Sequence, residues 1–541
     1  MSVARSSMLM ASGTVISRVL GFARSVVAAL AIGVTTDAAD AFGVANQLPN
    51  NVYAIIVGGV LNAVLVPQLV KSRLHSDGGK GYIDRLVTFI LTVFFAVTAL
   101  ATFAAPLLIS LYTSGWSPNQ LALATAFAYW CLPQLFFYGL YSILGEVLNA
   151  RSSFGPFMWA PVLNNLVAIA GLGIFIGMFG PGATLEWDQG QIALVAGSWT
   201  LGVVSQALIL FFFWKRIGLR FSFNFKLRGL GLRPALKAAS WTLAMLVITQ
   251  IGGLIQTAIT STTLSARTAT TGTPIEGIAS VAVAGTAWLI FMIPHSVGTV
   301  SIATAYFTRM SEHAHAKNFD ALKEDVVHAL RLILVISSVA AAVMLTLCFP
   351  IARVFALEYR PTVALALVLA AMMVGLIPFS LNFMLQRVFY ALEDTKSPFV
   401  FTTIQIVVFV IGAYLCANYV EAIGLVAAIS LVMSLSFAVQ ASIAYVLLVK
   451  RIGRFENSGL IGYGMQVIGA GVFAGVATAS MVWALGGIAE GAYPIASGLG
   501  ALVTCVVAGA VGVVVYLGLL LLAKNPEVRS GVSALKGILR R

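Results

Sequence analysis

The chain has 541 residues, of which 60% are hydrophobic and only 9% are charged, and its mean hydropathy is +0.96. A soluble protein of this size needs a far more polar surface, so this composition excludes a soluble enzyme and indicates a protein that crosses a membrane many times. The formal net charge of +13 would suit a nucleic-acid partner, but the placement of the basic residues argues against one.

The first apolar segment, residues 8–33, is long enough to span a bilayer and carries two arginines, Arg18 and Arg24. An arginine near the bilayer centre costs at least about 2.5–3.5 kcal/mol, so it usually faces a water-filled cavity or a partner. Because its planar fork of donors suits phosphate, the pattern favours a cationic cavity for an anionic substrate. The alternative is that Arg24 snorkels to an interface and Arg18 pairs with a carbonyl. The two lie about 120° apart around a helix, so they need not share a face.

The second apolar segment carries four side-chain amides around a proline: Asn46, Gln47, Pro49, Asn50 and Asn51. Amides cannot face lipid without leaving donors unsatisfied. Because proline also frees a backbone carbonyl one turn back, the segment predicts a kinked helix whose amides turn into a cavity. Such a cavity suits the hydroxyls and amides of sugars or peptides. The alternative is hydrogen bonding between helices of the same lobe.

Further along the chain, apolar runs of about 20 residues or more predict about fourteen membrane-spanning helices. Their centres lie near residues 20, 55, 100, 135, 168, 203, 248, 292, 337, 377, 408, 435, 473 and 507. Four of the longer spans contain a proline, which predicts a kinked or broken helix. These prolines are Pro49, Pro133, Pro294 and Pro378.

The loop charges predict the orientation of these spans. With a cytoplasmic N-terminus, the even-numbered connections hold most of the basic residues, and the odd-numbered ones are short and acidic or neutral. The most basic connection carries Lys215, Arg216, Arg220, Lys226, Arg228, Arg233 and Lys237. Both termini are therefore expected inside, and the positive charge is expected to mark topology and contact with anionic membrane lipids, with no nucleic-acid partner.

Three pairs of landmarks share one offset of 245 residues, which predicts an internal repeat. They are Pro49 with Pro294, Pro133 with Pro378, and Arg151 with Lys396. The offset corresponds to six spans, an even number, so the two halves run parallel. Two-lobe repeats are typical of transporters that alternate access around a midplane site.

The expected architecture is all-α: a polytopic membrane protein with fourteen transmembrane helices, in two six-helix lobes related by the parallel repeat, plus two C-terminal helices. The predicted boundaries are an N-lobe over residues 1–214 with spans 1–6, a cytosolic linker over 215–237 and a C-lobe over 238–450 with spans 7–12. Residues 451–541 hold spans 13 and 14 and a short cytosolic tail.

No catalytic pattern is found: the sequence has no glycine-rich phosphate loop with lysine, no His-Glu pair at metal spacing and no serine elbow. We therefore expect a transporter rather than an enzyme, with no catalytic residues, no bound metal and no cofactor. His313 and His315 form a His-x-His pair, for which a solvated loop is favoured over a metal site. His295 follows Pro294 in span 8 and matches Asn50 in the repeat, so it is a candidate cavity residue.

Several segments resemble the MurJ/MviN family, which are lipid II flippases of the multidrug/oligosaccharidyl-lipid/polysaccharide exporter superfamily. SRVLGFAR (residues 17–24), DAFGVANQLPN (40–50) and VLNAVLVPQLVK (60–71) resemble its N-terminal signature. RVFYALEDTKSPF (387–399) is similar to the family's FYA-x-x-DT-R/K-x-P element. Span count and lobe division also match, so the resemblance covers essentially the whole chain.

The resemblance implies a V-shaped cavity lined by cationic residues, which takes the pyrophosphate and the sugar–peptide headgroup. Spans 13 and 14 would form a groove for the polyprenyl tail. Arg18 and Arg24 match the family's first-helix arginines and are expected to contact the diphosphate, while Pro49 and Asn50 match its Leu-Pro-Asn kink. The expected substrate-binding set is Arg18, Arg24, Gln47, Pro49, Asn50 and His295.

The chain departs from the family pattern at four positions. Tyr53 and Gly58 stand where many members carry arginine and then glutamate, and Leu289 and Met292 replace an arginine and a glutamate in span 8. The cavity is therefore expected to have fewer formal charges, and the first-helix arginines carry more of the anion binding. The family's cation site in the second lobe cannot be placed on this sequence.

The leading hypothesis is a flippase that moves undecaprenyl-diphosphate-linked peptidoglycan precursor from the cytoplasmic to the outer leaflet of a bacterial plasma membrane by alternating access. Transport would be driven by a coupled monovalent cation or by the membrane potential. Its expected protein partners are proteins of cell-wall synthesis or division. The alternative is a polysaccharide-repeat flippase or a cation-coupled drug antiporter on the same scaffold, although an antiporter should favour acidic cavity residues. A scaffold without transport would not need arginine and clustered amides in mid-membrane.

Overall fold

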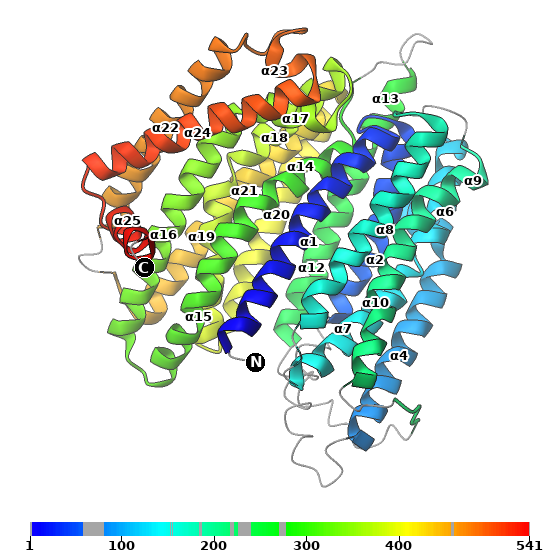
Figure 1. The fold of residues 1–541 in the computed structure, drawn as a ribbon, viewed down its shortest axis with the longest axis horizontal. Helices are drawn as coiled ribbons and strands as arrows, with labels where there is room; N and C mark the ends of the chain where they lie inside the picture. Colours follow the sequence, from blue (N-terminus) through cyan, green and yellow to red (C-terminus); the bar gives the residue numbers. More distant parts are fainter. Residues whose placement is uncertain are drawn as a thin grey trace. The chain divides into compact units, whose positions relative to one another are not determined.

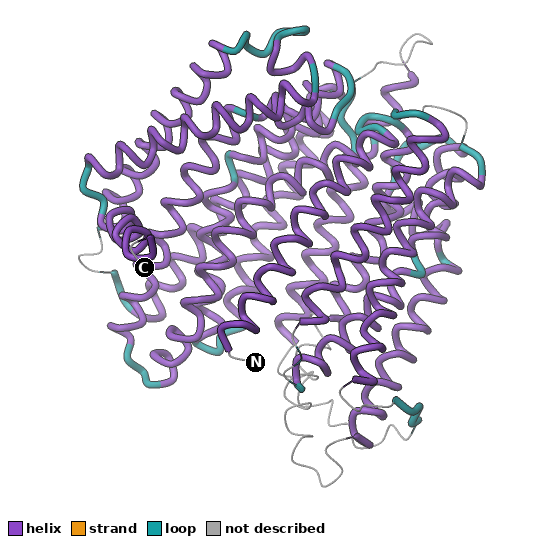
Figure 2. The backbone as a smooth tube through the Cα atoms, in the orientation of Figure 1, coloured by secondary structure: helices purple, strands orange, loops and turns teal. Residues whose placement is uncertain are grey.

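The computed structural model describes residues 3–57, 80–151, 153, 155–182, 187–216, 221–225, 240–269, 277–455 and 459–539. Over these ranges the chain is built of helices joined by short loops, without strands (Figures 1 and 2). Twelve helices are long and apolar enough to cross a membrane, and one bent pair makes a thirteenth span. The prediction of an all-α, multi-pass membrane protein is confirmed. Adding α2 (Asp37–Ile56) would give the expected fourteen, although α2 does not itself meet that test of length and composition.

The chain forms two compact units, Met1–Ser265 and Ala266–Arg541. The helices of the first unit are α1 (Val3–Ile32), α2, α4 (Lys80–Phe103), α5 (Ala105–Tyr112), α6 (Pro118–Cys131), α7 (Gln134–Ala150), α8 (Gly155–Phe179), α9 (Gln189–Ile192), the π-helix η2 (Ala193–Gly197), α10 (Ser198–Arg216) and α12 (Ser240–Ser261). The short helix α13 (Thr263–Ala269) crosses the boundary.

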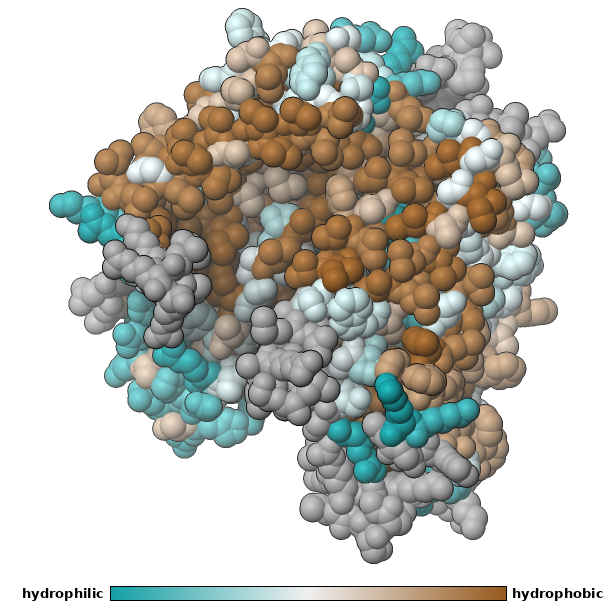
Figure 3. All heavy atoms as spheres, in the orientation of Figure 1, coloured by the Kyte–Doolittle hydropathy of each residue, from teal (hydrophilic) through white to brown (hydrophobic). Residues whose placement is uncertain are grey.

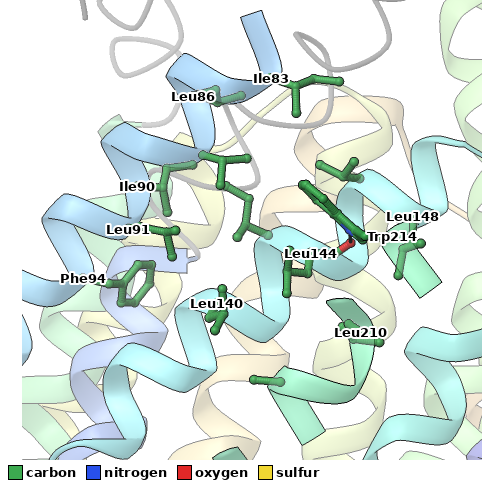
Figure 4. Close-up of a cluster of buried hydrophobic side chains, with 14 of the residues drawn as sticks. Ile83, Leu86, Ile90, Leu91, Phe94, Leu140, Leu144, Leu148, Leu210 and Trp214 are labelled. Carbon is green, nitrogen blue, oxygen red and sulfur yellow. Dashed lines mark hydrogen bonds between the residues drawn. The ribbon is translucent and has the colours of Figure 1, made fainter. Parts of the chain in front are cut away.

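In the first unit, α8 packs between α1 and α10, and α7 packs against α4 and α10. Figure 4 shows the apolar core that joins α4, α7 and α10, whose side chains point toward one another. Trp214 closes this core, because its indole Nε1 donates a 3.1 Å hydrogen bond to the Leu144 carbonyl. This core fixes α7, which carries part of the candidate site.

Helix α12 belongs to the first unit, although it was expected to open the second lobe. It packs against α2 and α5. Its last residue, Ser261, accepts a 2.8 Å bond on Oγ from the Ser114 amide, and its carbonyl accepts a 3.1 Å bond from Trp116 Nε1. The division by packing therefore falls between Ser265 and Ala266. The boundaries at 214/215 and 237/238 stay predictions from the sequence, and most of the 215–237 linker lies outside the described residues.

The helices of the second unit are α14 (Val281–Pro294), the π-helix η3 (His295–Thr299), α15 (Val300–His315), α16 (Phe319–Thr346), α17 (Cys348–Phe355), α18 (Tyr359–Met373), α19 (Leu376–Ala391), α20 (Lys396–Tyr419), α21 (Ala422–Ile452), α22 (Leu460–Ala484), α23 (Tyr493–Ala496), α24 (Gly498–Leu522) and α25 (Pro526–Leu539). Helix α16 is central to it, since α15, α19, α22 and α24 all pack against α16.

The two C-terminal spans, α22 and α24, lie side by side (Figure 1) and are joined to α16 by a buried polar cluster. The Arg331 guanidinium of α16 lies 3.5 Å from the Glu527 carboxylate of α25 and 5.0 Å from the centre of the Tyr463 ring. The Tyr463 hydroxyl lies 3.3 Å from Asn525 Oδ1, to which it donates. Spans 13 and 14 are thus an integral part of the second unit.

Three of the four span prolines lie at irregular points. Pro133 falls between α6 and α7, Pro294 ends α14 just before η3, and Pro378 lies in the first turn after the 45° bend between α18 and α19. At Pro133 and Pro378 proline is tolerated because the first N–H groups of a helix have no helical partner. Pro294 lies inside a helix, directly before the π-helical turn η3. At Pro49, α2 continues without a break, which excludes a broken helix there, and the predicted kink stays a prediction.

The face shown in Figure 3 is largely apolar across its middle, with hydrophilic residues gathered toward its upper and lower edges. Many large hydrophobic side chains are exposed; Phe103 of α4 and Trp483 of α22, for example, are 88% and 82% exposed. A water-soluble protein does not expose so much apolar surface. These side chains are suited to contact lipid.

Glycine at position 171 lets α8 and α10 approach closely. A Cβ there would lie 2.1 Å from the Cβ of Ser198 on α10, whereas a Cβ at Gly173 on the same helix would meet nothing within 4 Å. We expect Gly171→Val to destabilise the protein by about 1–3 kcal/mol, as overpacked cores do. Thermal unfolding in detergent measures this, with Gly173→Val as the matched control. Equal unfolding temperatures for the two variants would contradict the close packing.

Candidate functional site

Arg24 occupies an aromatic setting inside the first unit. Its Cζ lies 4.2 Å from the centre of the Trp199 ring of α10, and Trp199 in turn packs edge-on against Phe42 of α2. Among the described residues, no carboxylate lies within ion-pair distance of Arg24, and its buried Nε has no hydrogen-bond partner. A cation–π contact offsets about 0.5–2 kcal/mol of the cost of burying the charge. The guanidinium therefore keeps unused hydrogen-bond donors in a half-buried position.

Tyr138 of α7 connects Arg24 to the polar part of α2. It lies close enough to Arg24 for an electrostatic interaction, and its side chain also interacts with Asn50. Its hydroxyl donates a 3.0 Å bond to Gln134 Oε1 one turn earlier. Gln134 is completely buried and donates in turn to Thr200 of α10 at 2.8 Å. Tyr138 thus lies within electrostatic reach of both Arg24 and Asn50, which the sequence proposed as site residues.

The four amides of α2 divide into two groups. Gln47 Oε1 accepts a 3.4 Å bond from Thr257 of α12, and Asn51 donates a 3.1 Å bond to the Tyr112 hydroxyl of α5. Both bonds join α2 to another helix of the first unit, and the substrate-binding role of Gln47 stays a prediction. Asn46 keeps a buried Oδ1 without a partner among the described residues, and Asn50 is exposed, with its Nδ2 donating to the Asn46 carbonyl at 3.1 Å. The second pair retains capacity for a polar ligand.

Arg18 lies in a different environment from Arg24. It is exposed on α1, whereas Arg24 is half-buried. Next to it, the Ser17 carbonyl accepts a 2.9 Å bond from Asn165 of α8, which fixes this turn of α1. The two arginines thus differ in exposure, as their spacing of about 120° around the helix allows.

His295 begins η3 and is packed into the interior of the second unit. It is 1% exposed, its Nδ1 lies 3.2 Å from Ser380 Oγ, and its ring contacts Phe379 and Phe383. Pro49 is also buried, in the middle of α2. The substrate-binding roles given to His295 and Pro49 stay predictions, and the packing shows both as interior residues. Of the two positions where the first lobe departs from the family pattern, Tyr53 packs against Tyr138 and Gly58 lies outside the described residues.

Two residues of this region, Trp199 and Tyr138, were not singled out from the sequence. Each lies on an apolar span far from Arg24 in the chain, and aromatic residues are common in such spans. The contact depends on how α1, α7 and α10 are rotated about their axes, which no local pattern indicates.

A family model described as lipid II flippase MurJ matches residues 28–489, which is most of the chain. The chain belongs to this family. Among curated relatives, a probable lipid II flippase MurJ of Rhizobium meliloti (strain 1021) is 27% identical over 432 residues, covering 75% of this chain and 74% of the relative. That of Borreliella burgdorferi is 25% identical over 461 residues, covering 82% of this chain and 83% of the relative.

Solved structures agree on the fold. A lipid II flippase MurJ in an inward closed conformation aligns with a TM-score of 0.71 at 19% identity, covering 95% of this chain and 98% of that one. A MATE transporter in complex with MaL6 aligns with a TM-score of 0.58 at 16% identity, covering 84% and 96%. The MurJ fold is thus shared over nearly the full length, and the more distant MATE likeness places the chain on the same general scaffold.

Asn50 allows a graded test of the region around Tyr138. We expect Asn50→Ala to weaken transport less than loss of either first-helix arginine, because a neutral hydrogen bond contributes about 0.5–1.5 kcal/mol and one to a charged group about 1.5–3 kcal/mol. Growth supported by each variant in a flippase-depleted strain measures the order. An inactive, well-expressed Asn50→Ala beside active arginine variants would reverse it and contradict a mechanism centred on the diphosphate.

Proposed function

We propose that this protein translocates lipid II, the undecaprenyl-diphosphate-linked peptidoglycan precursor, from the cytoplasmic to the outer leaflet by alternating access. The observation that carries the proposal is the match of the MurJ family model over residues 28–489. The protein is a multi-pass membrane transporter and breaks no covalent bond. Its task is to shield a charged headgroup while that headgroup crosses the apolar layer.

In this proposal, Arg24 and Arg18 bind the diphosphate. Arg24 is suited to it because Trp199 contacts the guanidinium without taking up its hydrogen-bond donors, and no described carboxylate neutralises its charge. A phosphate that accepts two of those bonds replaces part of the hydration it loses. Asn50 and Tyr138 would then contact the sugar or peptide part of the headgroup, since both are neutral and can donate and accept.

The setting that we propose is the plasma membrane of a bacterium, with both termini cytoplasmic, as the basic connections predict. Enzymes of cell-wall synthesis or division are the proposed protein partners, because they make the precursor or consume it. The drive for net movement would be a monovalent cation gradient or the membrane potential. A moving diphosphate carries negative charge, so the membrane potential acts on it directly.

The decisive experiment is depletion of the organism's own flippase with this chain supplied from a plasmid. We expect growth and cell shape to be restored, and lipid II to stop accumulating in the inner leaflet. A vesicle assay with fluorescent lipid II and purified protein should show movement between leaflets. Continued accumulation with the protein present at normal membrane levels would refute the proposal. Transport of a cationic drug without lipid II movement would favour an antiporter.

A further inference from the structure

Arg387 of α19 lies between two aromatic rings of the second unit. Its Cζ is 5.1 Å from the centre of the Phe383 ring on its own helix and 5.7 Å from that of Phe307 on α15. The side chain is half-buried, one turn before α19 ends at Ala391. The position lies within the span, where a charge is costly.

No residue that the structure describes supplies a counter-ion to this guanidinium. Among the described residues, no carboxylate lies within 4.0 Å of Arg387, and its side chain makes no hydrogen bond. On α15 and α16, which both pack against α19, the buried Asp325 lies 2.8 Å from Arg309 and 3.4 Å from His313. Elsewhere in the unit, Arg331 reaches Glu527.

The setting of Arg387 has the same chemistry as that of Arg24 in the first unit. In both, aromatic rings contact the cation, no acid neutralises it, and in-plane N–H donors stay available. Each cation–π contact offsets only about 0.5–2 kcal/mol of the burial cost. A planar fork with free donors fits the oxygens of a phosphate. The sequence motif of residues 387–399 included Arg387, but no role followed from it.

We propose that Arg387 binds a lipid-borne phosphate at the end of α19 that leads into Lys396, which the loop charges predict to be cytosolic. The substrate's diphosphate and the phosphate of an anionic phospholipid share this chemistry. In the first case Arg387 is the cation of the second unit that takes the headgroup before translocation, in place of the arginine absent at Leu289. That case rests on the proposed function.

The test uses purified full-length protein in phosphatidylcholine nanodiscs, with fluorescent lipid II as one probe and phosphatidylglycerol as the other. We expect Arg387→Gln to weaken binding of one probe about tenfold or more, the effect of losing a charge-assisted bond of about 1.4 kcal/mol or more. Arg387→Lys should recover part of it, because the charge remains and the fork does not. Arg451→Gln, which changes an exposed arginine at the end of α21, is the matched control: it should bind lipid II as wild type does and lose less phosphatidylglycerol affinity than Arg387→Gln.

A purely structural role would lower the unfolding temperature without changing probe affinity, so each variant's unfolding temperature is measured with its binding. Phe307→Leu keeps the charge and removes one ring, and should give a smaller loss. Weakened lipid II binding identifies the diphosphate, and weakened phosphatidylglycerol binding alone identifies a leaflet lipid. Wild-type affinity of Arg387→Gln for both probes overturns the inference. If wild type itself does not bind or move lipid II, the proposed function fails, and the phosphatidylglycerol measurement still decides on Arg387.

Discussion

Replacing Arg24 with glutamine is expected to lower lipid II translocation about a hundredfold or more. Two charge-assisted hydrogen bonds of about 1.5–3 kcal/mol each would be lost, and a factor of ten corresponds to about 1.4 kcal/mol. Arg24→Lys should recover only part of the activity, because lysine keeps the charge but neither stacks on Trp199 as a plane nor presents a fork. The rate at which fluorescent lipid II moves between leaflets of vesicles is measured for wild type, Arg24→Gln and Arg24→Lys.

A variant of Trp199, whose ring contacts the Arg24 guanidinium, is the control for this result. Trp199→Leu should reduce transport by a smaller factor, about three- to thirtyfold, because a cation–π contact is worth about 0.5–2 kcal/mol and the charge stays in place. In the double variant Arg24→Gln/Trp199→Leu, the second change should add little, since the two residues act through one contact. Fully additive losses would show that Trp199 does not act by positioning the guanidinium.

Replacing Arg18 with alanine is expected to abolish complementation of a strain depleted of its own lipid II flippase, while insertion and folding persist. Arg18 is exposed on α1, so little packing is lost with it. Arg18→Lys should support only partial growth, because attraction to the diphosphate survives and bidentate binding does not. Membrane levels of each variant are measured in parallel.

The competing account makes a clear contrary prediction for Arg18. If the side chain only reached an interface or paired within the unit, lysine would serve nearly as well and alanine would ease insertion into the bilayer. Normal growth with Arg18→Ala at wild-type expression would therefore remove Arg18 from the binding site.

Sequence patterns predicted the spans well because lipid imposes a simple requirement: every backbone group must bond within its own helix, so each span appears as a long apolar run. The same requirement marked Pro133 and Pro294 as points of irregularity. It was less informative at Pro49, where the helix continues. Proline removes only the one hydrogen bond to the carbonyl four residues earlier, here that of Ala45, and α2 continues through this gap.

The sequence indicated the charged residues of the candidate site, but not the aromatic residues that surround Arg24. Arg24 stands out because a charge inside a span is costly and rare. Trp199 and Tyr138 do not, since they resemble any other apolar or aromatic position, and only the packing of three helices brings them to Arg24. His295 stands out for the same reason as Arg24, yet it lies in the interior beside Ser380. A polar residue in a span predicts a partner, and the partner can be the protein itself.

The contact of α16 with α22 and α25 has a consequence for biogenesis. Helix α16 approaches α22 where Gly471 and Gly475 leave no side chain between them, and the Arg331 guanidinium of α16 lies 3.5 Å from the Glu527 carboxylate of α25. A ribosome releases α22 and α25 after α16, so the second unit keeps an open apolar face on α16 until these helices follow. Premature termination before Leu460 should therefore expose a degradation signal to membrane proteases, and insertion chaperones are expected to hold α16 until translation finishes.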